Sequence, residues 1–316
     1  MTSRSDSMSG FKRKVGAARL HVSEKHREWL LAYACLSLWF IGFMVLQAGA
    51  MVYSFLLSFF HADMLTPARF IGLANYQRML GDSLFLKSLG VTSRYALAAV
   101  PLAVTLSLLV ALMLNEKLPA QGVWRTLFYV PSVVSGIAVA ILWGWMFNPS
   151  VGLINSGLAV FGIQGPRWLA SEQWALPAFV IMSLWGVGGN MLLYLAGLQS
   201  IPTDLYEAAK IDGATAASRF WHVTLPMLSP TLFFTTVMGI IAAFQLFTEP
   251  YVMTGGGPNN ATLTAVLQIY RVSFEQFRFG YASVLAWILF AIILLCTLLV
   301  FRSSALWVYY EAELRK

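Results

Sequence analysis

Residues 207–230 read EAAKIDGATAASRFWHVTLPMLSP, a polar stretch that lies between two strongly apolar segments. Just before and within it, residues 205–211 have the amphipathic pattern of a short helix, and either Thr203 or Asp204 could serve as its N-cap. A polar helix between apolar segments is typical of a loop that connects two membrane spans. The stretch therefore predicts a short helix that projects from the membrane.

The second half of this stretch predicts a turn and another helix. Gly213 permits a sharp change of direction that a residue with a Cβ would resist. We expect a second short helix over residues 215–222. Pro226 and Pro230 are typical of the start of the long helix that follows. The sequence therefore predicts a rigid helical hairpin to which another protein can bind.

The composition places this hairpin in an integral membrane protein. Of the 316 residues, 58% are hydrophobic and 11% are charged, whereas charged residues make up about 25% of a soluble domain. The apolar runs are near the length of about 20 residues that a membrane helix needs, and longer than the strands of about 10 residues found in barrels. We therefore expect an all-α integral membrane protein.

The apolar runs predict six transmembrane helices after a polar tail. We expect the tail to cover residues 1–28 and the membrane domain residues 29–316, with a loop at 203–230 on the cytoplasmic side. The tail is not expected to be a cleaved signal peptide, because it and the apolar run after it are too long. The expected spans are residues 29–60, 88–114, 126–147, 173–198, 231–250 and 281–301.

The distribution of Lys and Arg predicts the orientation. Two tails and two loops that would share one side carry 14 of these residues, and the other side carries 7. The side richer in Lys and Arg faces the cytoplasm. Both termini and residues 203–230 are therefore expected inside the cell.

The polar loop resembles the EAA loop of permease subunits in ABC importers that depend on a binding protein. Several positions match at fixed spacing, and Val223 stands where the family usually has Ile. The resemblance implies that the matching residues couple the permease to an ATPase. Those residues are Glu207, Ala208, Ala209, Asp212, Gly213, Leu225 and Pro226. Taken alone, Glu207 could equally be a solvated carboxylate near a helix start.

Other stretches resemble the carbohydrate-uptake (sugar permease) subfamily of these proteins. They include GLANY at residues 72–76 and longer segments at 128–149 and 277–290, so the likeness covers nearly all of the chain after residue 29. It implies the architecture of a type I ABC importer permease with six spans. It also implies residence in a bacterial inner membrane and import of a sugar or sugar derivative.

The chain lacks the glycine-rich phosphate loop that ends in Gly-Lys-Ser/Thr and contains no Gly-Lys pair. We therefore expect a transporter subunit that is not an enzyme and binds no cofactor, with ATP and Mg²⁺ used by a partner. The resemblance implies a second homologous permease forming a heterodimer, an ATPase dimer on the cytoplasmic side and an extracytoplasmic solute-binding protein. Membrane lipid is also expected as a partner. Four scattered histidines and two cysteines inside apolar runs indicate no metal site, and nothing indicates nucleic acid.

Two segments supply candidate substrate residues. Residues 244–260 resemble the segment that closes the fifth span of sugar permeases, and they alternate Gln245, Thr248 and Glu249 with aromatic residues. Hydroxyl-rich ligands need polar partners for their hydroxyls and apolar faces for the sugar ring. Alternatively, Glu249 is simply a carboxylate at the membrane interface.

The fourth span supplies the other candidates, which are Trp185, Asn190 and Tyr194. A buried amide needs hydrogen-bond partners, which favours Asn190 as a ligand. Tyr194 lies four residues further and is expected on the same helix face. Glycines 186, 188 and 189 permit either close helix packing or an opening for substrate.

Two alternatives remain open. A self-contained secondary transporter is a different class, but the chain shows no paired inverted repeat and no charged relay in mid-span. An importer of glycerol phosphodiesters or polyols keeps the class and changes the cargo. A phosphate ester would favour Arg or Lys in the cavity. None lies in mid-span, but Arg94, near the outer end of the second span, could serve.

Overall fold

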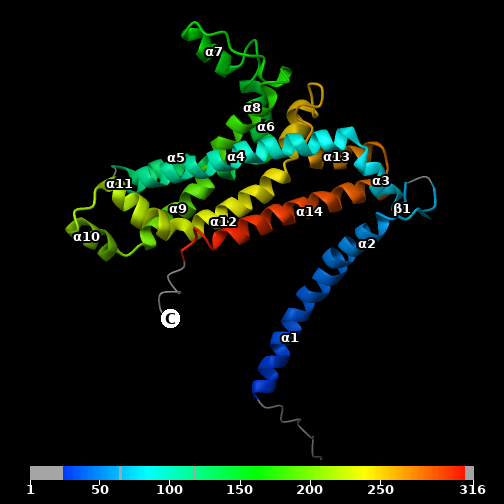
Figure 1. Ribbon diagram of the computed structural model, residues 1–316, viewed down its shortest axis with the longest axis horizontal. Helices are drawn as coiled ribbons and strands as arrows, with labels where there is room; N and C mark the ends of the chain where they lie inside the picture. Colours follow the sequence, from blue (N-terminus) through cyan, green and yellow to red (C-terminus); the bar gives the residue numbers. More distant parts are fainter. Residues whose placement is uncertain (1–23, 64–65, 117–118, 310–316) are drawn as a thin grey trace, which may run out of the picture. The chain divides into compact units, whose positions relative to one another are not determined.

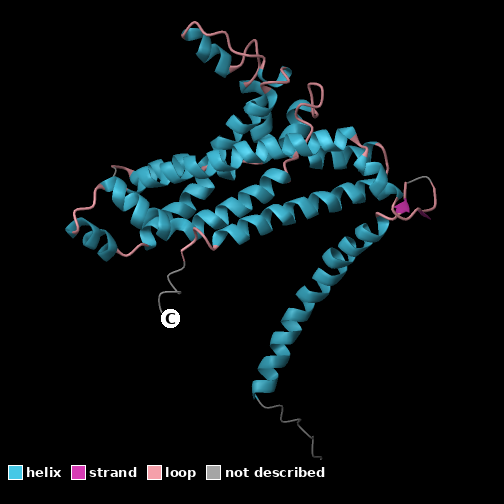
Figure 2. Ribbon diagram, in the orientation of Figure 1, coloured by secondary structure: helices cyan, strands magenta, loops and turns pink. Residues whose placement is uncertain are grey.

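The computed structural model describes residues 24–63, 66–116 and 119–309, and these are mostly helical (Figure 2). The chain divides between Tyr53 and Ser54 into two compact units.

The first unit is helical throughout its described part. Helix α1 (Glu24–Gly42) continues through a π-helical segment, η1 (Phe43–Ala48), into α2 (Gly49–Leu57), which crosses the unit boundary. Apolar side chains such as Trp39 and Leu46 are exposed. Residues 28–57 form a helix of 30 residues that is apolar and long enough to cross a bilayer. This helix matches the expected first span closely.

The second unit begins with a two-residue antiparallel ladder between β1 (Phe60–His61) and β2 (Arg69–Phe70), in which Phe60 pairs with Phe70. The helices of its first half are α3 (Ala74–Leu80), α4 (Ser83–Asn115), α5 (Gln121–Tyr129), η2 (Val130–Val133), α6 (Gly136–Met146), α7 (Leu153–Val160), η3 (Trp168–Ala170), α8 (Ala175–Ser183), η4 (Leu184–Gly186) and α9 (Gly188–Ser200). The helices of its second half are α10 (Thr203–Ile211), α11 (Ala216–Arg219), η5 (Phe220–Thr224), α12 (Leu225–Phe244), η6 (Pro250–Thr254), α13 (Ala265–Tyr270), η7 (Arg271–Glu275) and α14 (Phe279–Ser304).

Among the described residues, four helices have the length and apolarity to cross a membrane, and counting each of two bent pairs as one crossing gives six. The bent pairs are residues 121–146, with an angle of 98°, and residues 175–200, with an angle of 46°. These correspond to the third and fourth expected spans. Both had been expected as single runs, because apolar composition shows no bend.

The fifth span differs from expectation at both ends. Residues 216–244 form one helix of 29 residues, so the second short helix predicted in the loop is continuous with the span. Pro226 lies in the first turn of α12, directly after the π-helical segment η5, whose wider hydrogen-bond spacing lets the helix continue past the missing N–H, and Pro230 lies inside α12. The helix ends at Phe244, six residues before the expected end at Pro250.

Helices α4, α12 and α14 run alongside one another in the second unit, with α10 at one end and α3 and α13 at the other (Figure 1). Helix α12 packs against both α4 and α14, and α4 also packs against α9. One apolar cluster contains Tyr95, Phe179 and Phe244. A second cluster, nearer to α10 in the chain, contains Met191 and Leu228.

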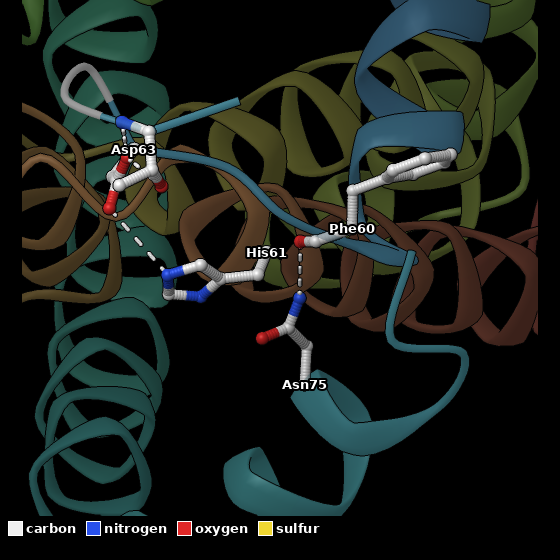
Figure 3. A network of polar contacts seen from close by, with 5 residues as sticks. Phe60, His61, Asp63 and Asn75 are labelled. Atoms are coloured by element: carbon white, nitrogen blue, oxygen red, sulfur yellow. Dashed lines mark hydrogen bonds and ion pairs between the residues drawn. The ribbon is translucent and has the colours of Figure 1, made fainter. Parts of the chain in front are cut away.

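The end of the unit that holds α3 is fastened by polar contacts (Figure 3). The amide of Asn75 donates to the carbonyl of Ser58 at 2.9 Å and to that of Phe60 at 3.0 Å, and His61 pairs with Asp63 at 3.6 Å. Nearby, Tyr281 on α14 donates to the Asp82 carboxylate at 2.6 Å, and the same carboxylate caps the start of α4. The residues of the GLANY stretch thus join α3 to the chain segment that follows α2.

Candidate functional site

The polar loop is built around α10 and its ending. The Gly213 N–H donates to the Lys210 carbonyl at 3.0 Å, and the Ala214 N–H donates to the Ala209 carbonyl at 2.9 Å. This is a Schellman ending, which requires a left-handed residue, and Gly213 has a φ of +76°. The expected side-chain cap is absent: Pro202 is the N-cap of α10 and makes no side-chain cap bond.

The same helix presents part of the predicted coupling motif to its surroundings. Glu207 and Ala208 are exposed, Ala209 is half-buried, and Asp212 and Gly213 are exposed where the helix ends. Leu225 and Pro226 are half-buried in the first turn of α12. The structure therefore places five motif residues on the projecting helix and its turn, and two at the base of the long helix.

One exposed residue beside this motif was not predicted. Ile211 is 87% exposed and lies four residues after Glu207, so the two share a face of α10. The base of α10 is held by a hydrogen bond of 3.0 Å between the hydroxyls of Tyr206 and Thr224. The available sequence signal is an isoleucine four residues after Glu207 in the polar loop. The face is suited to docking with another protein.

A cavity of about 360 Å³ lies further along the unit, and several predicted substrate residues line it. Asn190 comes from α9, and Gln245, Thr248 and Glu249 come from the segment after α12. The volume falls within the range of about 300–1,000 Å³ that small-molecule sites occupy. The structure therefore brings together four of the six residues proposed from the sequence.

The cavity segment takes its shape from the break after α12. Gln245 is the C-cap residue, and the next helical segment, η6, begins only at Pro250. The carbonyl of Leu246, left free by the break, accepts a hydrogen bond of 2.8 Å from the buried Thr264 hydroxyl. The next amide, Ala265 N–H, donates to the Thr92 hydroxyl on α4 at 2.9 Å. These buried bonds fix the segment between α4 and α13.

The two other predicted residues lie away from this cavity. Tyr194 is fully buried and its hydroxyl is 2.5 Å from that of Thr235. Trp185 packs edge-on against Trp143, with ring centroids 6.1 Å apart, and lines a separate apolar cavity of about 290 Å³. At Gly188, an added Cβ would collide with the carbonyl of Phe128, so this glycine permits close approach of α9 and α5.

Three polar residues that line the cavity were missed. They are Tyr95 on α4, Ser183 on α8 and Thr235 on α12. Alanines 99 and 103 follow Tyr95 at intervals of four residues and line the cavity with it. That stripe of a tyrosine and two small residues on one face of a span was the available signal.

Residues 255–260, which follow the cavity segment, form a glycine-rich turn that is hydrogen-bonded by two basic side chains. Arg271 donates to the Gly255 carbonyl and to the side-chain oxygen of Asn260, the latter at 3.3 Å. Lys87 on α4 donates to the Asn259 carbonyl at 2.6 Å. Arg94 is exposed and donates to the Gly90 carbonyl of its own helix at 3.2 Å, and it does not line the cavity. Across the described residues, no cluster of three or more His, Cys, Asp and Glu could hold a metal ion.

Comparison with known proteins gives a family match and similar relatives. A family model described as a binding-protein-dependent transport system inner membrane component matches residues 103–310. The probable ABC transporter permease protein YesP of Bacillus subtilis is 40% identical over 289 residues, which cover 90% of this chain and 93% of YesP. The lactose transport system permease protein LacF of Rhizobium radiobacter is 38% identical over 243 residues, which cover 75% of this chain and 81% of LacF.

A solved structure is similar over most of the chain. It is a chain of a bacterial alginate ABC transporter in complex with a periplasmic protein bound to an alginate pentasaccharide. The TM-score is 0.78 at 23% identity, and the match covers 90% of this chain and 96% of that one. At this identity the likeness shows a shared fold.

Proposed function

This chain belongs to the family of binding-protein-dependent transport system inner membrane components, and we propose that it moves a sugar or sugar derivative across the membrane. Members of this family are permease subunits and not enzymes, and the helices described here make this one a multi-pass membrane protein. The observation that carries the cargo proposal is the cavity, where an amide, a hydroxyl and a carboxylate face small apolar side chains. The lactose permease relative supports the same class of cargo.

In this proposal the chain works with partners. A separate ATPase dimer hydrolyses ATP with Mg²⁺ and grips the exposed face of α10 through Glu207, Ala208 and Ile211. A second homologous permease completes the transport path, and an extracytoplasmic binding protein delivers the sugar. Both termini and α10 lie in the cytoplasm of a bacterial cell, in accord with the excess of Lys and Arg on that side.

The coupling role follows from how the loop is built. Helix α10 is held to the base of α12 by Tyr206 and Thr224, and its Schellman turn fixes the direction of the chain into α11. Movement of α10 is therefore transmitted to α12, which ends at the cavity. This supports a pathway by which closure of an ATPase dimer changes access to the cavity.

The first experiment is a mild-detergent purification from native membranes with a tag at the C-terminus, followed by mass spectrometry. We expect to recover an ATPase with a Gly-Lys-Ser/Thr loop and a second six-span permease. The purified complex, supplied with its binding protein in liposomes, should import sugar only with ATP. A chain that is recovered alone and moves solute without ATP would establish the secondary-transporter alternative instead.

Coupling is tested separately with a double variant. Glu207→Lys with Gly213→Pro should abolish uptake while the chain remains inserted at its normal level. Glu275→Lys, an equal charge change on an exposed residue remote in the chain from α10, is the control and should keep uptake. Normal uptake by the double variant would contradict the coupling role.

A further inference from the structure

Glu249 has an unusual position among the acidic residues of the chain. It is half-buried and lines the cavity beside Thr248 and Gln245. The only ion pair among the described residues joins His61 to Asp63, so Glu249 has no cationic partner within the part of the chain that the structure describes. Among residues 24–63, 66–116 and 119–309, no Lys, Arg or His side chain lines this cavity.

Such a carboxylate is costly to bury. A charge removed from water is usually paired or faces a water-filled path, and ionisable groups at membrane depth generally face a cavity. A glutamine would have nearly the same shape and would fill the same space without that cost. Packing alone would be satisfied by glutamine. The carboxyl group of Glu249 is therefore expected to have a role in ligand recognition.

The other described side chains that line the cavity are all uncharged or apolar. Asn190, Gln245 and Thr248 are neutral, and Tyr95, which lies within electrostatic reach of Glu249, is also neutral as a phenol. The remaining wall is made of apolar or small side chains such as Ala99 and Gly239. A ligand here meets hydrogen-bonding groups and one carboxyl group that has no cationic partner among the described residues.

We propose that Glu249 acts as a charge filter: it lets uncharged polyhydroxyl ligands hydrogen-bond in the cavity and repels ligands that carry a carboxylate, phosphate or sulfonate. The proposal rests on the proposed function and narrows its substrate class to neutral sugars and polyols. Hydroxyl groups donate hydrogen bonds to a carboxylate, whereas an anion at the same place meets like-charge repulsion that low dielectric strengthens. Glu249 is thus a specificity-determining residue.

The charge of the cavity can be measured without knowing the sugar. The natural cysteines, Cys35 and Cys296, are replaced by serine, and Thr248→Cys is introduced as a reporter. The complete transporter, in nanodiscs at pH 8, is then treated with a cationic reagent, methanethiosulfonate ethyltrimethylammonium, or an anionic one, methanethiosulfonate ethylsulfonate. This pH is well above the ordinary glutamate pKa of about 4.3. The quantity compared is the ratio of the two reaction rates.

With Glu249 present, we expect the ratio of cationic to anionic rate to exceed that of a free thiol in solution by about tenfold or more. Glu249→Gln should bring the ratio to within about twofold of the free thiol, whereas Glu275→Gln, which removes an exposed carboxylate elsewhere, should leave it unchanged. If Thr248→Cys fails to assemble, Gln245→Cys is the second reporter. A ratio that Glu249→Gln does not alter would overturn the charge filter.

Sugar import by the reporter-free complex separates this inference from the proposed function. If the complex imports sugar with ATP but Glu249→Gln leaves the rate ratio unchanged, only the charge filter fails. If Glu249→Gln lowers the ratio but the wild-type complex imports no sugar, the filter stands and the sugar-import proposal fails.

Discussion

At the scale of single residues, Gly213 is the position where backbone geometry limits the side chain most clearly. Its φ of +76° costs an L-residue with a Cβ about 1–2 kcal/mol. Gly213→Ala should therefore loosen the end of α10 and reduce ATP-driven uptake several-fold while the amount of inserted protein stays constant. Uptake is measured in proteoliposomes that contain the full complex.

The matched control for this change is Gly122→Ala. Gly122 is exposed on α5, has no left-handed φ, and an added Cβ meets nothing within 4 Å. It should keep full uptake. Equal rates for both variants would show that the left-handed turn is not needed for coupling.

A second prediction concerns the amides of the cavity. Asn190→Ala and Gln245→Ala should each lower sugar transport about three- to tenfold, because each removes a side chain that can hydrogen-bond the ligand, a contact worth about 0.5–1.5 kcal/mol. The ATPase should still co-purify. Gln199→Ala, on an exposed residue near the end of α9, should transport normally. Wild-type transport by both cavity variants would remove these residues from the substrate path.

At the scale of elements, the crossing of α9 and α5 depends on Gly188. A Cβ there would collide with the carbonyl of Phe128, so the two helices must separate. Gly188→Ala should cost about 1–3 kcal/mol, as overpacking commonly does, and should lower the midpoint of thermal unfolding in detergent. Gly186→Ala is the control two residues away, because its Cβ would meet nothing within 4 Å. Similar midpoints for the two variants would contradict this account.

The break after α12 gives another prediction for an element. Thr264→Val keeps the shape of the side chain but removes the hydroxyl that holds the Leu246 carbonyl. An unpaired buried carbonyl costs about 1–3 kcal/mol, so we expect a lower unfolding midpoint and weaker sugar-stimulated ATP hydrolysis. Thr264→Ser keeps the hydroxyl and should restore most of both. Failure of serine to restore them would indicate that the methyl group, not the hydrogen bond, matters.

At the scale of the whole molecule, the orientation can be read by chemical labelling. In the cysteine-free background, Ile211→Cys should react with a membrane-impermeant maleimide only after the cells are permeabilised, because α10 is proposed to lie inside. Glu275→Cys should react in intact cells. Both residues are exposed in this chain. The reverse labelling pattern would place the termini outside the cell.

Much of the architecture could be predicted from composition, because six apolar runs are long enough to be recognised and the polar loop between two of them is distinct. The bends in the third and fourth crossings could not be predicted in this way. The turn of 98° in the third crossing falls between Pro131 and Gly136, and neither residue type by itself predicts a bend of that size. The continuity of α11 with α12 is not predicted because Pro226 is typical of a helix start, whereas the structure places a π-helical segment, η5, just before it and the helix continues through.

The cavity was predictable where polar residues interrupt an apolar segment, as Gln245, Thr248 and Glu249 do. Tyr194 shows the limit of helix periodicity. It lies one turn from Asn190, but Thr235 on α12 meets its hydroxyl there and closes it off from the cavity. Which turn of a helix reaches a cavity depends on how neighbouring helices cross, and a single sequence does not contain that information in readable form.

The unbroken helix over residues 216–244 has a mechanical consequence. At 1.5 Å per residue its 29 residues form a lever about 43 Å long, with the loop that we propose docks an ATPase at one end and the cavity wall at the other. If such a lever pivots rigidly about one end, a tilt of about 5° displaces the other end by about 4 Å, more than half the pitch of an α-helix. A small rotation applied at the loop is thus geometrically enough to carry Gln245 past a neighbouring side chain, and a passage for a sugar could open without any helix unfolding.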